Sequence, residues 1–136
     1  MKISGKLLLI LSFLIPAPAM AAQFTCSIQN VFRLGENGNF VTHGRAALYQ
    51  NRKFFLDPGT GKITGTTALH ARLSNYDGHD SPIIMRKNGF RAITLFRDKN
   101  SYALIQIDDA KKDDGERPFF YYTPLDMMLT GTCKKD

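Results

Sequence analysis

Tryptophan is absent from the 136-residue sequence, so ten phenylalanines and five tyrosines must supply the large apolar surfaces of a core. No Gly-x-Ser-x-Gly stretch occurs, and the sequence therefore contains no signal for the nucleophile of an α/β-hydrolase. The three histidines, His43, His70 and His79, do not have zinc-site spacing, and we predict no metal and no cofactor. After the first 21 residues no apolar run is long enough for a membrane-spanning helix, and we predict no membrane span.

The N-terminus has the three regions of a secretory signal peptide. Lys2 and Lys6 precede the apolar run "LLLILSFLI", which is followed by the small-residue stretch "PAPAMAA". Ala19 and Ala21 fit an A-x-A cleavage site. We predict a signal peptide over residues 1–21 and a single mature domain over residues 22–136, in the periplasm or secreted. An uncleaved membrane anchor is the alternative.

The charge is mildly basic. The formal net charge is +6, and removing the two lysines of the signal peptide leaves +4. This excess suits contact with an anionic envelope surface, but it is below the density of a dedicated nucleic-acid binder. Export also argues against nucleic acid as the partner.

The two cysteines, Cys26 and Cys133, lie near the two ends of the mature chain. In an oxidising compartment an even pair indicates a disulfide bond. We expect this bond to join the first strand to the last and to protect two sheet edges.

Strand patterns dominate the rest of the chain. Alternating or β-branched runs stand at 24–32, 46–50, 53–57, 82–87, 90–97, 101–108, 119–123 and 129–133, with a charged loop over 109–117. Only 66–76 and 123–128 have helical patterns. We predict a mainly β fold, an antiparallel sandwich or small closed barrel of about seven to eight strands with one or two short helices.

The stretch "FFLDPGTGKITG" suggests a phosphate-binding loop at first sight. A P-loop needs glycine where Leu56 stands and a hydroxyl where Ile63 stands, so the motif fails at both ends. Pro58, the glycines and an aspartate that can bond ahead to the backbone are typical of a tight turn. We predict a hairpin tip.

The same stretch carries a family resemblance. It resembles an F-x-D-x-x-T-G-x-I-x-G pattern of small exported bacterial proteins of unknown function, which also have a signal peptide and a cysteine near each end; the matching residues are Phe55, Asp57, Thr60, Gly61, Ile63 and Gly65. The resemblance implies a compartment and a fold, and no activity.

The densest polar cluster is "NYDGHDS", residues 75–81. His79 with Asp77 or Asp80 could form an acid–base pair or contribute to an ion site, which makes an envelope hydrolase the alternative function. Turns rich in Asp and Asn also form for purely local reasons. The cluster lacks the acidic first position and the distal Glu of an EF-hand loop.

Arginines suggest an anion site. Asn88-Gly89 is a hairpin signal, and a two-residue turn there places Arg86 directly opposite Arg91, with Arg97 further along the same face. Facing arginines repel each other unless an anion lies between them, so we predict an anion-binding patch. The alternative is that each arginine points into water or finds an acidic partner within the fold.

The run "FFYY", residues 119–122, places alternate aromatic rings on the two faces of a strand. We expect both pairs to fill the core. If one pair is exposed, it marks a sugar- or protein-binding surface, and Tyr121 is our candidate ligand contact.

Together these features predict a monomeric, exported binding module that holds an anionic or glycan component of the envelope, or another exported protein. No catalytic residue is nominated. A structural subunit, recognisable by a large exposed apolar patch, is a third possibility.

Overall fold

The computed structural model describes residues 22–108 and 115–136. The predicted signal peptide and most of the predicted charged loop, residues 109–114, lie outside the described residues. The described residues form nine strands, two short α-helices and a 3-10 helix: β1 (Phe24–Leu34), β2 (Phe40–Thr42), α1 (Ala46–Tyr49), β3 (Lys53–Leu56), β4 (Ile63–Gly65), α2 (His70–Leu73), β5 (Ile83–Met85), β6 (Phe90–Phe96), η1 (Arg97–Lys99), β7 (Ser101–Ile107), β8 (Arg117–Tyr122) and β9 (Met128–Lys135).

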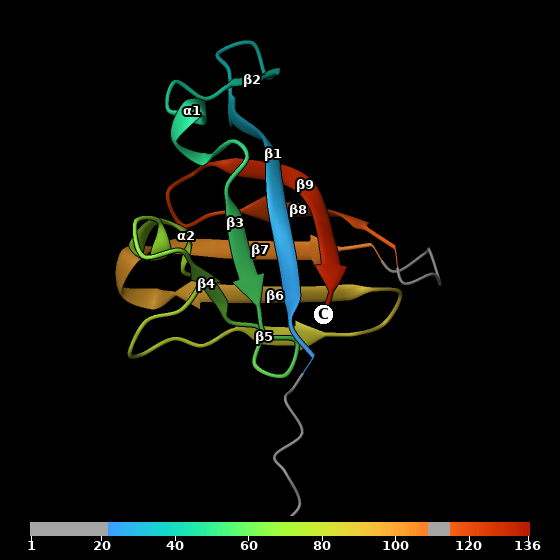
Figure 1. Cartoon of the computed structure of the whole chain (residues 1–136). Coiled ribbons are helices and arrows are strands. Elements are labelled where there is room, and N and C mark those ends of the chain that lie inside the picture. Colours follow the sequence, from blue (N-terminus) through green and yellow to red (C-terminus); the bar gives the residue numbers. More distant parts are fainter. Residues whose placement is uncertain (1–21, 109–114) are drawn as a thin grey trace, which may run out of the picture.

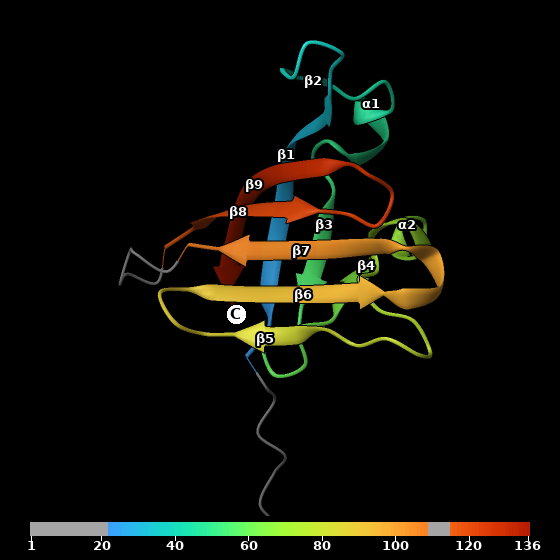
Figure 2. The same ribbon diagram turned by 180° about the vertical axis from the view of Figure 1, so that it is seen from behind.

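All strand pairs are antiparallel, and the predicted mainly β fold is confirmed. The strands follow the order β4-β3-β1-β9-β8-β7-β6-β5, and β2 pairs with the far end of β1. The sheet curls into a half-barrel in which β1, β3 and β4 cross over β5, β6 and β7, with the core between them (Figures 1 and 2). Its edge strands are β4 and β5.

In the open seam between these two edges, Asn75 links the β4 edge to β6, the neighbour of the edge strand β5. Its Oδ1 accepts a hydrogen bond from the Ile63 N–H at 2.7 Å, and its Nδ2 donates to the Gly61 carbonyl at 2.8 Å. The Asn75 carbonyl accepts from the Thr94 hydroxyl of β6 at 2.5 Å. Asn75 is buried, and it therefore satisfies backbone groups at the β4 edge that no strand pairs.

The predicted disulfide is present. Cys26 of β1 and Cys133 of β9 are directly opposite in the ladder, and the bond closes a sequence separation of 107 residues. In the chain-entropy account such a bond contributes about 4–5 kcal/mol. The expectation that it protects sheet edges is wrong, because β1 and β9 are central strands.

Aromatic rings fill the core in place of tryptophan. The Phe54 ring packs edge-on against Phe119 at 5.1 Å between centroids and lies 5.9 Å from Tyr121. All three rings are buried. Since β3 and β8 supply these rings from separate parts of the sheet, the contact holds the two layers of the half-barrel together.

The predicted helices are shorter than their patterns. In the 66–76 segment only α2 is helical, although Leu69 and Leu73 are both buried. The 123–128 segment forms a turn, in which the Thr123 hydroxyl accepts from two backbone N–H groups. The strand predicted at 46–50 is wrong: residues 46–49 form α1, a four-residue helix that buries its first and last residues, Ala46 and Tyr49.

The tip of the β3–β4 hairpin is a turn, as predicted. Leu56 pairs with Ile63, and the Asp57 carboxylate accepts hydrogen bonds from the Gly59 N–H and the Thr60 hydroxyl. Gly61 takes a φ of +73°, which side chains rarely adopt. These contacts are those of a tight hairpin turn.

Candidate functional site

The β5–β6 hairpin differs from the predicted register by one residue. Met85, not Arg86, lies opposite Arg91, because the turn is one residue longer and takes positive φ at both Asn88 and Gly89. A shift of one residue moves a side chain to the other face of a strand. The predicted face-to-face arginine pair is therefore wrong.

The two arginines serve opposite faces of the sheet. Arg86 follows Ile84 on the side of the core, and its Nη2 donates to the Pro58 carbonyl at 2.7 Å. Arg91 lies on the outer face, where its Nε donates to Oε1 of its cross-strand neighbour Gln106 at 3.1 Å. Arg86 thus connects the β5–β6 hairpin to the β3–β4 turn, and Arg91 takes no part in that connection.

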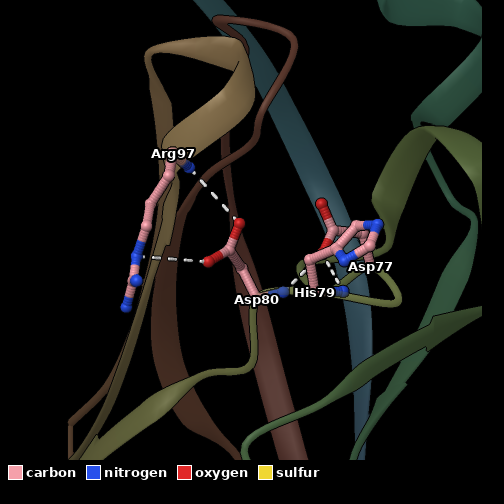
Figure 3. Close-up of polar contacts among 4 residues, drawn as sticks. All are labelled: Asp77, His79, Asp80 and Arg97. Atoms are coloured by element: carbon pink, nitrogen blue, oxygen red, sulfur yellow. Dashed lines mark hydrogen bonds and ion pairs between the residues drawn. The ribbon is translucent and has the colours of Figure 1, made fainter.

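Arg97 lies at the opposite end of β6 from the hairpin. Its backbone N–H donates to Oδ2 of Asp80 at 3.3 Å, and its Nε lies 3.6 Å from Oδ1 (Figure 3). The Arg97 side chain is 87% exposed, so this surface ion pair contributes little to stability. The predicted cluster of Arg86, Arg91 and Arg97 is not assembled.

The carboxylates of the polar cluster are engaged locally. Asp77 Oδ1 accepts hydrogen bonds from the backbone N–H groups of His79 at 2.8 Å and Asp80 at 2.6 Å (Figure 3). The Asp80 and His79 N–H groups hold the pKa of Asp77 below its ordinary value of 3.8. The arrangement is an Asx turn, and the geometry gives the hydrolase alternative no support.

Tyr121 is a core residue and not a surface contact. Its side chain is fully buried, and its hydroxyl donates to the Leu73 carbonyl at 2.6 Å. Burial raises the pKa of Tyr121 well above the ordinary value of a phenol. A ligand at the surface cannot reach this ring, so Tyr121 drops out of the candidate site.

The other "FFYY" pair points outward. Phe119 shares the core with Tyr121, whereas Phe120 is 36% exposed and Tyr122 is half-buried. The expectation that both pairs fill the core is therefore wrong. The sequence argument assigns a binding surface to whichever pair is exposed, and in the structure that pair is Phe120 and Tyr122 instead of the pair that contains Tyr121.

One of the predicted arginines does line a pocket. We call this cavity, of about 160 Å³, the cationic pocket; it is lined by Phe24, Pro58, Arg86, Gly89, Phe90, Ile107, Arg117 and Lys135. It lies where β1 begins and β9 ends, at the lower end of the molecule in Figure 1. Its floor is apolar, since Phe24, Phe90 and Ile107 are all buried.

Three cationic side chains surround this floor. Arg117 lies over the Phe24 ring, with its Cζ 5.9 Å from the centroid, and Lys135 is the register partner of Phe24. Arg86 approaches from the hairpin and keeps N–H groups beyond the one that bonds to Pro58. Among the described residues that line the pocket there is no carboxylate. The pocket can therefore receive an anionic group and pack a small apolar group beneath it.

Sequence reasoning found Arg86 but missed the other two cations. Arg117 and Lys135 lie at a strand start and a strand end far along the chain, and only the curl of the sheet brings them beside the hairpin. No local pattern marks Arg117. For Lys135 the one hint was the run "CKK", because a strand that continues past Cys133 carries Lys135 to the end of the ladder.

Two further findings concern ions and membranes. Within residues 22–108 and 115–136, no group of three or more His, Cys, Asp or Glu side chains is placed to hold a metal ion. In the same ranges no helix has the length and apolar character needed to cross a membrane.

No protein-family model, no curated protein and no solved structure matches this chain.

Proposed function

We propose that the protein is a small exported binding module of the bacterial envelope, and that it holds an anionic ligand in the cationic pocket. The observation that carries the proposal is the cluster of Arg86, Arg117 and Lys135 around a buried apolar floor. Export rests on the predicted signal peptide, and the disulfide between Cys26 and Cys133 agrees with an oxidising compartment.

The size of the cavity limits the ligand. Its volume of about 160 Å³ is close to that of an engineered protein cavity of about 150 Å³ that holds one benzene molecule. The pocket thus suits a carboxylate or phosphate that carries one small ring or a short chain. Such a group can belong to a free metabolite, to an acidic glycan or to an acidic side chain of another exported protein.

Calorimetric titration of the mature protein tests the proposal. Benzoate should bind, whereas benzyl alcohol, which keeps the ring and loses the charge, should bind at least about tenfold more weakly. Arg86→Gln should weaken benzoate binding by about tenfold. Arg91→Gln is the matched control, because that arginine lies on the other face of the sheet, and it should leave binding unchanged.

Two results would contradict the proposal. Equal binding of benzoate and benzyl alcohol would show that the cations play no part. An Arg86→Gln protein that binds as well as the native protein, or a loss with Arg91→Gln of the same size, would place the anion elsewhere.

A structural subunit is the second candidate, favoured by one observation. Ile83, Ile93 and Leu104 are cross-strand neighbours in one row on the outer face, and the row continues to Tyr122. Ile83 is 59% exposed. Sedimentation of the mature protein separates the two: a monomer at tens of micromolar supports the binding module, whereas a stable assembly supports the subunit.

A further inference from the structure

A second hollow lies at the other end of the molecule from the cationic pocket. We call it the aromatic groove; it has a volume of about 500 Å³ and is bordered by Leu34, Phe40, Tyr102, Tyr122 and Leu125. It lies between the β1–β2 hairpin, at the top of Figure 1, and the neighbouring ends of β7 and β8. Its volume is within the range of about 300–1,000 Å³ that is typical of ligand sites.

Three exposed apolar side chains line the groove. Phe40 is 65% exposed, Leu34 is 63% exposed and Leu125 is 53% exposed. These three side chains come from β1, from β2 and from the β8–β9 turn, and all three line the same hollow. Exposed apolar side chains that gather around a concavity mark a binding site more strongly than scattered ones do.

The floor of the groove is a fixed aromatic platform. The rings of Tyr102 and Tyr122 stack with centroids 5.0 Å apart and an interplanar angle of 24°. The Tyr122 hydroxyl donates to Asp126 Oδ1 at 2.7 Å, which holds its ring in place. Tyr102 is 47% exposed and therefore offers a ring face to a ligand.

A cationic hollow of about 320 Å³ adjoins the groove. It is lined in part by Arg45 and Arg72 and shares His43 and Leu125 with the aromatic groove. Of the described residues that line the two hollows, Asp126 is the one carboxylate, and its Oδ1 accepts from Tyr122. The combined surface is aromatic in the groove, where Arg33 adds one cation, and basic in the adjoining hollow.

This combination fits an acidic saccharide better than a peptide. The C–H groups on one face of a pyranose ring pack against an aromatic ring, and carboxylates on the same chain pair with arginines. Peptides in sheet proteins commonly gain affinity by adding a strand to a sheet edge. Here the floor is made of the stacked rings of Tyr102 and Tyr122 on the face of β7 and β8, and not of a strand edge.

We infer that the aromatic groove binds an acidic oligosaccharide. A sugar ring packs on the exposed face of Tyr102, and a carboxylate of the same chain reaches Arg45 and Arg72 in the adjoining hollow. This site is separate from the cationic pocket, because the two lie at opposite ends of the β1–β9 ladder.

Binding of tetragalacturonate to the mature protein tests the inference. The acid should bind, and its methyl ester, which keeps the rings and loses the charges, should bind at least about tenfold more weakly. Tyr102→Ala and Arg45→Gln should each weaken binding of the acid by about tenfold. Neither side chain is buried, so both variants should fold.

Two matched variants make the result specific. Tyr102→Phe keeps the ring and should keep the affinity. Leu95→Ala removes a side chain that is 55% exposed and does not line the groove, and it should change nothing. A uniform loss across all variants would contradict the assignment of the site.

Other outcomes would overturn the inference. If neither the acid nor its ester binds, or if the ester binds as well as the acid, the groove is not a site for acidic saccharides. If a tyrosine-containing acidic peptide binds through Tyr102 while tetragalacturonate does not, the occupant is a protein. Arg86→Gln should leave saccharide binding intact, so failure here is distinguishable from failure of the anion pocket.

Discussion

The two ends of the β1–β9 ladder are built differently. At the end where Phe24 pairs with Lys135, strands from both layers converge on a small cavity with an apolar floor and a cationic rim. At the end where Phe32 pairs with Met128, β1 continues past its partner into the β1–β2 hairpin.

This difference in closure determines what each end can bind. At the Phe24 end, where the strands converge, the cavity has room for one charged group and one small ring. At the Met128 end the strands separate, and a larger hollow exposes aromatic side chains. Under the two proposals, one curled sheet provides a pocket for a small anion at one end and a larger binding hollow at the other.

Removing the disulfide should have the largest effect and should affect the ends unequally. Cys26→Ala with Cys133→Ala should lower the free energy of unfolding by about 4–5 kcal/mol in urea. The bond lies two residues from the Phe24–Lys135 pair. Hydrogen exchange should therefore show a greater loss of amide protection at the pocket end than around Met128. Equal losses of amide protection at both ends would show that the disulfide does not stabilise the pocket end selectively.

Removing the Asn75 side chain should come next. Asn75→Ala leaves the Ile63 N–H and the Gly61 carbonyl buried without their partner, which should cost about 3 kcal/mol in urea unfolding. Ser74→Ala is the control, because that hydroxyl makes one local bond and should matter by less than about 1 kcal/mol. Since Pro58 and the β3–β4 turn border the pocket, benzoate binding should also weaken while saccharide binding persists. An unchanged stability would show that the seam does not depend on Asn75.

The smallest effect should appear at alkaline pH and at the groove end alone. The hydrogen bond to Asp126 and partial burial raise the pKa of Tyr122 from 10.0 to about 12. The folded state therefore holds this proton more tightly than the unfolded state does. The resulting stability is complete below pH 10 and is lost as the pH rises toward about 12.

The Tyr122→Phe variant should not show the decrease in folding stability between pH 10 and about 12 that Tyr122 causes. The Tyr76→Phe variant should show the same decrease as the native protein. Ultraviolet titration should show a phenol that ionises near pH 12 in the native protein and is missing from the Tyr122→Phe variant, while Tyr121, whose pKa burial raises further, stays protonated in both. A native titration identical to that of the variant would mean that the Asp126 contact is absent in solution.

Local features were predictable from the sequence, and tertiary placement was not. The disulfide, the β3–β4 turn and most strands follow from residue types within short windows. The β5–β6 register failed because a turn one residue longer reverses the face of Arg86 relative to Arg91. The helix α1 was missed because "AALYQ" is too short for periodicity to separate a helical turn from a strand.

The candidate sites depend even more on long-range contacts. Arg86, Arg117 and Lys135 approach each other only because the sheet curls, and that curvature has no signature in a single strand. The outward direction of Tyr122 is different, because alternation within "FFYY" already required one aromatic pair to face away from the other. Whether a further layer covers that pair depends on the tertiary fold, which no short window of residues encodes.

Amide chemical-shift mapping of the mature protein tests the central claim, that the two ends bind different ligands, most directly. Benzoate should shift the amides of Gly89, Phe90 and Lys135 and leave Phe40 and Tyr102 unmoved, and tetragalacturonate should do the reverse. If both ligands shift the same amides, or if neither shifts those of its assigned end, the account is contradicted.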